Sequence, residues 1–473
     1  MTENKKIIHI FIFICFLFLL LAGYLTYIQL FESTSLSANP YNNRNQQLEN
    51  DTLRGSIFDR NGKLLAYSKK TGDKQTRIYP FNNLYSQLIG YDSKIYGKSQ
   101  LEKQYDNYLV NRNIANPLLA IKNAFNSKEK TGNDLYLTID NKLQTLSRQL
   151  IGNRNGAVVA MDPKTGEILA MVSKPDFNPN SSTLEANWQN LAESSSHPFL
   201  PRATQGLYNP GSTFKIVIST AAFENGMGTV KMNDKGSVII DGRQIKNEGG
   251  SAYGNIDIGK ALSVSSNVYF SQIAVQLGQD RLKEITSRFE LGKEIPFNIP
   301  LEQSSFGYRN MSKADMASAG IGQGKVLVTP LQMAMITSAI ANKGNMMRPM
   351  LVNRISTHDG LLDLKNYKSS LLAHVTDSNT AAGIKKIMQE VVDKGTGRNA
   401  AIRGISVAGK TGTAENEFTG IQNRKEHSWF IGFAPVEDPQ IVVAVILEYN
   451  GSSGGSVAAP IARSIISEYL NNR

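Results

Sequence analysis

A serine and a lysine stand three residues apart within residues 209–217 (NPGSTFKIV), where a Pro-Gly turn meets an apolar run. If the run is helical, Ser212 and Lys215 lie one turn apart on one face. A serine becomes a nucleophile when a base removes its proton, and a partly buried lysine with a lowered pKa is such a base. The helix N-terminus adds N–H groups aimed at developing negative charge. Alone, this spacing is common and more often marks a capping serine followed by a surface lysine.

Two more short motifs follow in chain order and change that balance. SSN at residues 265–267 comes after a helix-like segment, and KTGT at residues 410–413 adjoins apolar strands near the C-terminus. Each motif is weak by itself. The order S-x-x-K, S-x-N, K-T-G resembles the motif set of the penicillin-binding and serine β-lactamase superfamily. Ser266 stands where that set has aspartate, a middle position whose side chain matters less to the shared mechanism.

The resemblance extends over nearly the whole chain and is most specific to class B penicillin-binding proteins. The pattern R-G-x-I-x-D-R-x-G at residues 54–62 resembles that family's N-terminal hairpin. The short region before residue 150 resembles the compact members of the penicillin-binding protein A or FtsI-like type. Further segments similar to the family are residues 97–108, 156–173, 322–324, 328–334 and 429–435.

The resemblance implies a peptidoglycan D,D-transpeptidase. Ser212 would attack the carbonyl between the two terminal D-alanines of a donor stem peptide, and an amine of a neighbouring stem peptide would then take the acyl group. β-Lactams would acylate the same serine as covalent inhibitors. The backbone N–H groups of Ser212 and Thr413 would form an oxyanion hole, a contribution of typically about 3 kcal/mol per donor. The implied catalytic residues are Ser212, Lys215, Ser265, Asn267 and Lys410, and the implied substrate-binding residues are Thr411, Gly412 and Thr413. No metal and no organic cofactor are implied.

Four apolar strands are expected to carry the motifs. Residues 156–162 and 167–173 flank a Pro-Lys-Thr-Gly turn, and residues 428–434 and 441–448 form a second pair. Their length and hydrophobicity suit a central sheet. Because helical segments lie between the two pairs, we expect an α+β architecture: an antiparallel sheet with helices inserted between its strands, as in the penicillin-binding and serine β-lactamase-like transpeptidase domain.

The clearest helix is predicted at residues 330–342. Thr329 is its expected N-cap, Pro330 takes the first helical position and Gly344 lies just past the end. Met333, Met335 and Ile336 are expected to pack in the core. A last helix, near residues 459–470, is expected to pack back on the sheet.

Length and composition exclude several classes of protein. The chain has 473 residues, room for two or three domains, and 51 − 40 gives a net charge of +11. The single cysteine, Cys15, excludes an internal disulfide and a cysteine-based zinc site. The basic balance suits an anionic membrane or cell wall, and no nucleic acid is expected as a partner because no known reader motif appears.

The N-terminus predicts a membrane anchor. Residues 7–28 are apolar and would span roughly 30 Å of hydrocarbon as a helix. No good cleavage site follows, and Lys5 and Lys6 place the N-terminus in the cytoplasm. The predicted organisation is a cytoplasmic tail (1–6), a single-pass anchor in the cell membrane (7–28), a stalk with a small irregular non-catalytic dimerisation or pedestal-like domain (29–150) and an extracytoplasmic transpeptidase domain (151–473).

The region before residue 150 contains few clear elements. Residues 31–53 read as a polar stalk, and Asn61-Gly62 predicts a hairpin turn between two short strands. Residues 101–109 form an amphipathic stretch.

Other residues invite functional roles that we do not assign. Glu294 and Asn298 have the E-x-x-x-N spacing of a deacylating glutamate in some β-lactamases, but a structural role is expected. His427 follows a charged run and is expected to be solvated rather than catalytic. Residues 451–455 (GSSGG) fit a loop near the substrate groove and a plain linker equally well.

Two alternatives to the transpeptidase remain open on the sequence. One is a hydrolase, either a D,D-carboxypeptidase or a β-lactamase, against which the anchor and residues 54–62 argue. The other is a catalytically silent β-lactam sensor, or a scaffold for a membrane glycosyltransferase. Class B proteins lack a glycan polymerase of their own, so the resemblance also implies a SEDS-type membrane glycosyltransferase as a partner.

Overall fold

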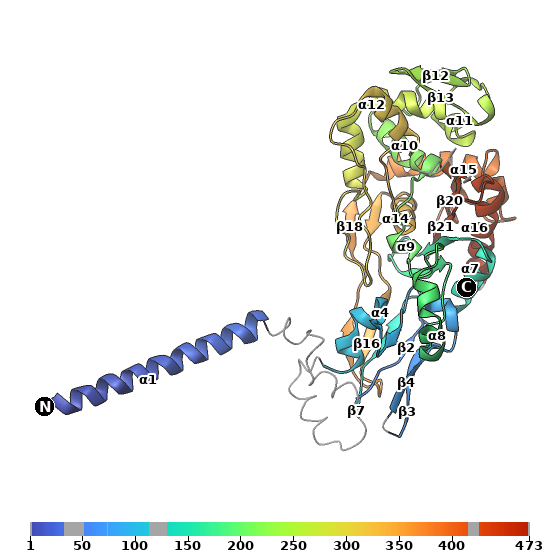
Figure 1. Ribbon diagram of the computed structural model, residues 1–473. Helices are drawn as coiled ribbons and strands as arrows, with labels where there is room; N and C mark the ends of the chain where they lie inside the picture. Colours follow the sequence, from blue (N-terminus) through green and yellow to red (C-terminus); the bar gives the residue numbers. More distant parts are fainter. Residues whose placement is uncertain (1, 33–51, 73, 113–129, 415–424, 472–473) are drawn as a thin grey trace.

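The computed structural model describes residues 2–32, 52–72, 74–112, 130–414 and 425–471. Most of the predicted stalk, residues 33–51, lies outside the described residues. Mixed helix and sheet content confirms the predicted α+β class (Figure 1).

A five-stranded antiparallel sheet carries one of the three motifs and supports the other two. Its order is β10-β9-β21-β20-β19. The two predicted strand pairs are both present, and pairing of β9 with β21 joins the early pair to the late one. The strands are β9 (Gly156–Met161), β10 (Ile168–Lys174), β19 (Ala408–Ala414), β20 (His427–Ala434) and β21 (Ile441–Leu447).

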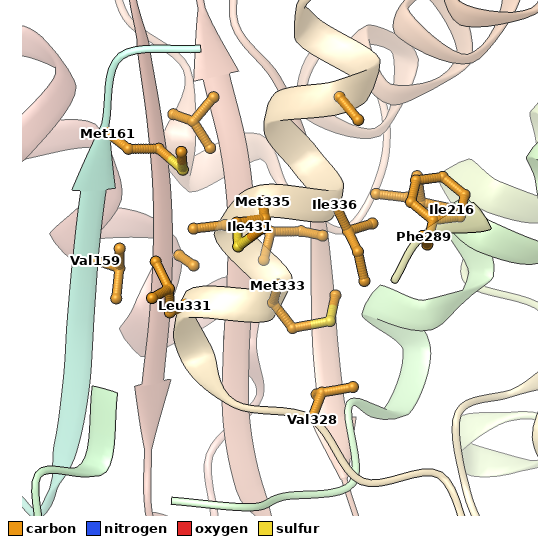
Figure 2. Close-up of a cluster of buried hydrophobic side chains, with 14 of the residues drawn as sticks. Val159, Met161, Ile216, Phe289, Val328, Leu331, Met333, Met335, Ile336 and Ile431 are labelled. Atoms are coloured by element: carbon orange, nitrogen blue, oxygen red, sulfur yellow. The ribbon is translucent and has the colours of Figure 1, made fainter. Parts of the chain in front are cut away.

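Both faces of this sheet are buried. Because side chains alternate along a strand, Val159 and Met161 enter one core, and Val158 and Ala160 enter a second core on the opposite face. Helix α14 (Pro330–Ala341) covers the first face, with the Thr329 hydroxyl accepting from the Gln332 N–H as the predicted cap. Figure 2 shows its methionines between the strands and the side chains of Ile216 and Phe289, which confirms the predicted core packing.

Helices α7 (Asn141–Ile151) and α16 (Gly454–Asn471) cover the second face. The predicted start of the last helix at residue 459 is wrong, because α16 begins at Gly454. A Cβ atom at Gly454 would lie 2.0 Å from the Trp429 carbonyl oxygen, so the glycine lets the helix begin against the sheet. Pro460 is consequently inside the helix and not at its first turn.

The remaining helices are α8 (Ser181–Ala192), α9 (Arg202–Gln205), α10 (Lys215–Glu224), α11 (Ile258–Ser263), α12 (Asn267–Arg288), α13 (Lys313–Gly320) and α15 (Ser378–Asp393), with 3-10 turns η2 (Asn82–Tyr85), η3 (Gly211–Phe214), η4 (Glu248–Gly250) and η5 (Arg398–Ala400). Short strand pairs are β1 (Thr52–Leu53) with β7 (Lys130–Thr131), β5 (Asp92–Ser93) with β6 (Gly97–Lys98), β11 (Met232–Asp234) with β14 (Gly254–Ile256), β12 (Ser237–Ile240) with β13 (Arg243–Lys246), and β15 (Asn345–Met347) with β18 (Leu371–His374). Among these helices, α10, α11 and α12 lie at the end of the molecule that carries β12 and β13, and α8 lies near β2 (Ile57–Phe58) and β4 (Lys74–Ile78) (Figure 1).

A second, six-stranded sheet has the order β17-β16-β8-β2-β3-β4. The predicted hairpin is present as β2 and β3, with Gly62 at a φ of +79° in the turn. Two of its strands come from far along the chain, between α14 and α15. The strands are β2 (Ile57–Phe58), β3 (Leu64–Thr71), β4 (Lys74–Ile78), β8 (Asp134–Leu137), β16 (Val352–Ser356) and β17 (Asp363–Asn366).

A buried ion cluster ties this sheet to helices α4 (Gln100–Gln104) and α5 (Asp106–Leu109), which form the predicted amphipathic stretch. Both Arg54 and Arg77 donate to the Glu102 carboxylate, at 2.7 and 2.8 Å. Burial by itself would raise the pKa of Glu102, but the two guanidinium groups hold it below its ordinary value. The conspicuous arginine at the start of residues 54–62 is therefore structural.

Helix α1 (Thr2–Tyr27) contains the predicted anchor, residues 7–28, except for its last residue. Residues 5–27 have a mean hydropathy of 2.7 and lie outside the protein core, and this is the one helix among the described residues long and apolar enough to span a membrane. A short π-helix (Ile28–Glu32) follows.

Candidate active site

The proposed nucleophile lies in a tight turn at the mouth of a cavity. Ser212 is in η3, which leads directly into α10, and it lines a cavity of about 560 Å³. Gly211 precedes it with a φ of +53° and donates its N–H to the Gly322 carbonyl at 3.0 Å. A side chain at Gly211 would collide with the Thr413 carbonyl, so only glycine permits this approach. Within the described residues the Ser212 hydroxyl has no hydrogen-bond partner, and it is partly exposed to the cavity.

Lys215 is completely buried one turn further on. Its Nζ lies 2.7 Å from the Ser265 carbonyl oxygen, 2.8 Å from Asn267 Oδ1 and 3.3 Å from Ser265 Oγ. Burial lowers the pKa of Lys215 well below its ordinary value, and the neighbouring charge of Lys410 lowers it further. The lysine is thus held among hydrogen-bond acceptors while its neutral form is favoured.

The SSN motif stands at the junction of α11 and α12. Ser265 adopts a φ of +59°, which turns its side chain between the two lysines, and its Oγ accepts a hydrogen bond from Lys410 Nζ at 2.9 Å. Asn267 is the first residue of α12, and its amide donates to the Lys246 carbonyl at 2.9 Å while its oxygen faces Lys215.

The KTGT motif forms part of β19, the edge strand of the five-stranded sheet. Burial lowers the pKa of Lys410 to about 7, against a smaller opposing effect of the Glu248 carboxylate. Thr411 shares a 2.6 Å hydrogen bond with Thr396. A Cβ atom at Gly412 would lie 3.0 Å from Thr213 Cγ2, so the glycine lets the strand pass beside the nucleophile turn.

The structure brings all eight predicted site residues to one place. Six of them line the cavity, and Lys215 and Lys410 lie buried beneath it. Sequence analysis missed Thr396, which stands in a Gly-Thr-Gly triplet that resembles the third motif and was the available signal. It also left open residues 451–455, of which Ser453, Gly454 and Gly455 line the cavity. Further lining residues that no pattern indicated are Arg243, Gln244, Lys246, Asn247, Glu248 and Ser318.

Two residues outside the motifs have defined positions. The prediction that His427 is solvated is wrong: it is 4% exposed, because it begins β20 beneath Tyr208 and Tyr449, and its Nδ1 accepts from the Tyr449 N–H. Asn298 is structural as expected, donating to the Tyr105 hydroxyl and accepting from the Leu351 N–H.

Family models match two regions of the chain. The penicillin binding protein transpeptidase domain matches residues 156–467, and the penicillin binding protein A dimerisation domain matches residues 54–135. Peptidoglycan D,D-transpeptidase PbpA of Mycolicibacterium smegmatis is 32% identical over 99% of both chains. Peptidoglycan D,D-transpeptidase MrdA of Acinetobacter baumannii is 31% identical over 85% of this chain and 67% of that protein.

Solved structures agree with the sequence relatives. Penicillin-binding protein A from M. tuberculosis, as a ceftriaxone acyl-enzyme complex, superposes with a TM-score of 0.85 and 30% identity, covering 89% of this chain and 100% of that one. A D,D-transpeptidase domain from Eggerthella lenta gives a TM-score of 0.80 and 32% identity over the same shares. With these matches and the three motifs meeting in one cavity, the chain belongs to the penicillin-binding protein transpeptidase family, as a class B member of the penicillin-binding protein A type.

Proposed function

We propose that this protein is a peptidoglycan D,D-transpeptidase that cross-links stem peptides through an acyl-enzyme on Ser212 and is a target of β-lactams. The observation that carries the proposal is the arrangement around Lys215. A buried amine with a depressed pKa lies one turn from a serine that opens into the cavity, and it contacts Ser265 and Asn267 of the second motif. The PbpA and MrdA relatives, which are named as D,D-transpeptidases, support the same reaction.

In the first half-reaction, Ser212 Oγ bonds to the carbonyl carbon of the penultimate D-alanine. Lys215 accepts the hydroxyl proton as general base. The peptide C–N bond breaks, and the terminal D-alanine leaves with a proton on its nitrogen. Ser265 lies between Lys215 and Lys410, so it is suited to relay that proton to the leaving amine. With a β-lactam the ring C–N bond breaks instead, and the nitrogen stays attached to the acyl group.

In the second half-reaction, the amine of a neighbouring stem peptide bonds to the acyl carbon. The ester C–O bond breaks, and the proton of the amine returns to Ser212 through the same lysine. The product is a cross-link and free enzyme, so no net proton is gained or lost by the site.

A neutral Lys215 can donate to only two of its three contacts. An ammonium donates three hydrogen bonds, whereas a neutral amine has two N–H bonds and a lone pair. We assign the two N–H bonds to the Ser265 carbonyl oxygen and Asn267 Oδ1, which are the closest acceptors at 2.7 and 2.8 Å, so the lone pair is left to accept the Ser212 proton. Asn267 Oδ1 accepts from Lys215, and one N–H of its amide donates to the Lys246 carbonyl. The second amide N–H is then available to orient the stem peptide.

Substrate binding is assigned to the edge strand β19. Lys410, Thr411 and the backbone at Gly412 would hold the terminal carboxylate and the peptide of the donor. The N–H groups of Ser212 and Thr413 would face the oxyanion, since the Gly211–Thr413 contact brings the two segments together.

Labelling of the purified full-length protein with a fluorescent penicillin tests the proposal. Wild type is expected to form a long-lived adduct, and Ser212→Ala is expected to form none. Ser219→Ala is the matched control, because Ser219 is buried in α10, the helix that follows the Ser212 turn, and its hydroxyl has no hydrogen-bond partner among the described residues, so labelling should persist. A transient wild-type label that is turned over would contradict transpeptidation in favour of a hydrolase, and no label on folded wild type would favour the silent scaffold.

The anchor and its surroundings form a second part of the proposal. The N-terminus is cytoplasmic because Lys5 and Lys6 precede the span, which places the catalytic region outside. Protease added to the outer face of spheroplasts should digest the catalytic region and spare an epitope fused before residue 1; the opposite pattern would reject this orientation.

The partner of the anchor is proposed to be a SEDS-type membrane glycosyltransferase, because this family adds peptide cross-links and not glycan. Exchange of residues 7–28 for an unrelated span is expected to weaken co-purification. Unchanged co-purification would argue against contacts through this helix.

We also propose that the part of the chain after the anchor is divided into a non-catalytic region (29–150) and a transpeptidase domain (151–473).

A further inference from the structure

Behind the SSN motif lies a buried carboxylate. Asp234 ends β11 and is 1% exposed. It accepts hydrogen bonds from the Gly236 N–H at 2.8 Å, from Asn247 Nδ2 at 2.8 Å to each oxygen, and from Ser266 Oγ at 2.6 Å. Within the described residues it has no salt-bridge partner. A buried carboxylate costs free energy unless hydrogen bonds satisfy it, and here neutral donors satisfy both oxygens.

Asp234 fixes the orientation of the Asn247 side chain. Because a carboxylate only accepts hydrogen bonds, the Asn247 amide must turn its NH₂ group toward Asp234. The amide oxygen therefore faces the other way, where it accepts the N–H groups of Asn267 at 2.8 Å and Val268 at 3.0 Å. These are the first two N–H groups of α12, which have no partner inside the helix.

Ser266 makes the second link. It is completely buried and caps α12, since its hydroxyl accepts from the Tyr269 N–H at 2.9 Å and donates to Asp234. Where the superfamily motif has an aspartate at this middle position, the hydroxyl here reaches a carboxylate carried by β11. The side chain at position 266 consequently matters more than the sequence suggests.

We propose that Asp234 is a positioning residue of the active site: its carboxylate fixes the first turn of α12 and, through it, the groups that surround Lys215. Ser265 precedes the cap and Asn267 follows it, so both depend on where that turn lies. The Asn267 amide also donates to the carbonyl of Lys246, the residue that precedes Asn247 in the chain. Both hydrogen bonds that Asn267 donates therefore end at residues 246–247. This inference rests on the proposed function, because it assigns a role within the same acyl transfer.

The charge of Asp234 also acts on Lys215. The charged groups that face Lys215 are Lys410 from β19, Glu248 from η4 and Asp234 from β11, and the Phe270 ring of α12 lies 5.5 Å from its Nζ. Burial and Lys410 lower the pKa of Lys215, and the two carboxylates oppose them. Loss of the Asp234 charge should therefore lower the pKa of Lys215 further and move the acidic limb of the acylation profile to lower pH.

The test measures acylation of the full-length protein in detergent by a fluorescent penicillin between pH 5 and 9. Asp234→Asn keeps the shape and removes the charge, and Asp234→Ser removes the carboxylate. Because a misplacement on the order of 1 Å can cost about 100-fold in rate, we expect the acylation rate constant to fall roughly 10- to 100-fold. The double variant Asp234→Ser with Ser266→Asp returns a carboxylate to the helix cap and should regain most of the rate. Asp241→Asn, in the exposed turn between β12 and β13, is the matched control and should acylate like wild type.

The labelled fraction at saturation separates positioning from folding. Support requires a near-complete labelled fraction, a slower rate, a shifted acidic limb and recovery in the double variant. A wild-type rate in both single variants, a loss confined to the labelled fraction, or no recovery in a folded double variant would overturn the proposal. If Asp234→Ser does not fold, Ser266→Ala, which removes one hydroxyl, must still slow acylation. Failure of the proposed function is distinguished because it would leave wild type itself unlabelled, or with a label that is lost by turnover.

Discussion

At the scale of single residues, the active site keeps two lysines in a place that disfavours their charge. Lys215 and Lys410 are both fully buried, and both hydrogen-bond with Ser265. Removing an ammonium from water costs free energy, and a second ammonium nearby adds to that cost. Burial of these lysines lowers the stability of the fold, but it also lowers their pKa values, and a neutral lysine can take a proton from serine.

Lys410 allows that loss to be measured. Burial lowers its pKa to about 7 from an ordinary value of 10.5, so the unfolded chain binds more protons than the folded protein between these two values. Stability contributed by this residue must then rise as pH increases from about 7 toward 10.5. At about 1.4 kcal/mol per pKa unit, the change amounts to several kcal/mol. Thermal unfolding of Lys410→Met should lack this rise.

The control for Lys410→Met is Lys69→Met, an exposed lysine on β3, which should keep the wild-type slope. Parallel slopes for wild type and Lys410→Met would contradict a depressed pKa at this lysine.

At the scale of elements, glycines decide how closely the motif segments approach one another. Gly454 begins α16 directly on the sheet, where a Cβ atom would also lie 2.5 Å from the Gly412 carbonyl oxygen. Because Gly412 lies beside the nucleophile turn, the start of α16 supports one wall of the cavity.

Gly454→Ala should therefore disturb both stability and acylation. The new methyl group meets two backbone oxygens, which cannot move as a flexible side chain would, so we expect destabilisation of about 1–3 kcal/mol. Acylation by fluorescent penicillin should slow because β19 is displaced. Arg463→Ala, on the exposed side of the same helix, is the control. A Gly454→Ala protein with wild-type melting temperature and rate would disprove the close packing.

The elements also show what the sequence could and could not predict. Strands β9, β10, β20 and β21 and helix α14 were predictable because hydrophobicity, turns and caps agree locally. The start of α16 was not, since Gly454 and Pro460 read locally as breakers and their compatibility comes from packing against Trp429. His427 was misjudged for the same reason: its neighbours in sequence are charged, but its neighbours in space are Tyr208 and Tyr449.

The candidate site was predictable to the extent that three motifs mark it. All eight predicted residues meet at one cavity. Asp234 and Asn247 belong to no motif. Their hydrogen bonds to each other and to α12 form only because β11 and the end of β13 lie beside the start of α12. Such partners could not be found from spacing along the chain.

At the scale of the whole molecule, the two sheets are interleaved in sequence. Strand β16 pairs with β8, and β17 follows it, so residues from between α14 and α15 complete the N-terminal sheet. Helix α7 ends at Ile151, so nearly all of it precedes the proposed transpeptidase domain in sequence, and it packs under β10 and against α16. Figure 1 shows β3, β4 and β7 at the end of the molecule opposite β12 and β13. The two proposed domains are therefore expected to unfold together.

Expression of residues 151–473 alone tests this coupling. The fragment leaves the β16 edge without β8 and uncovers the face that Leu143 occupies, so it should melt lower than the full chain and bind a dye specific for exposed apolar surface. A fragment that begins at residue 130, which restores β8 and α7, is the comparison. Equal melting of the two fragments would show that the shared sheet adds no stability.

The interleaving also sets an order on biosynthesis. Strand β8 leaves the ribosome long before β16, and β9 leaves it long before β21, its partner in the other sheet. Until the late strands arrive, both sheets would present an unpaired edge, which is a hazard for aggregation. In the proposed orientation, neither sheet can close until its late strands have crossed the membrane, so folding is expected to be largely post-translocational and to depend on factors that shield strand edges outside the cell membrane.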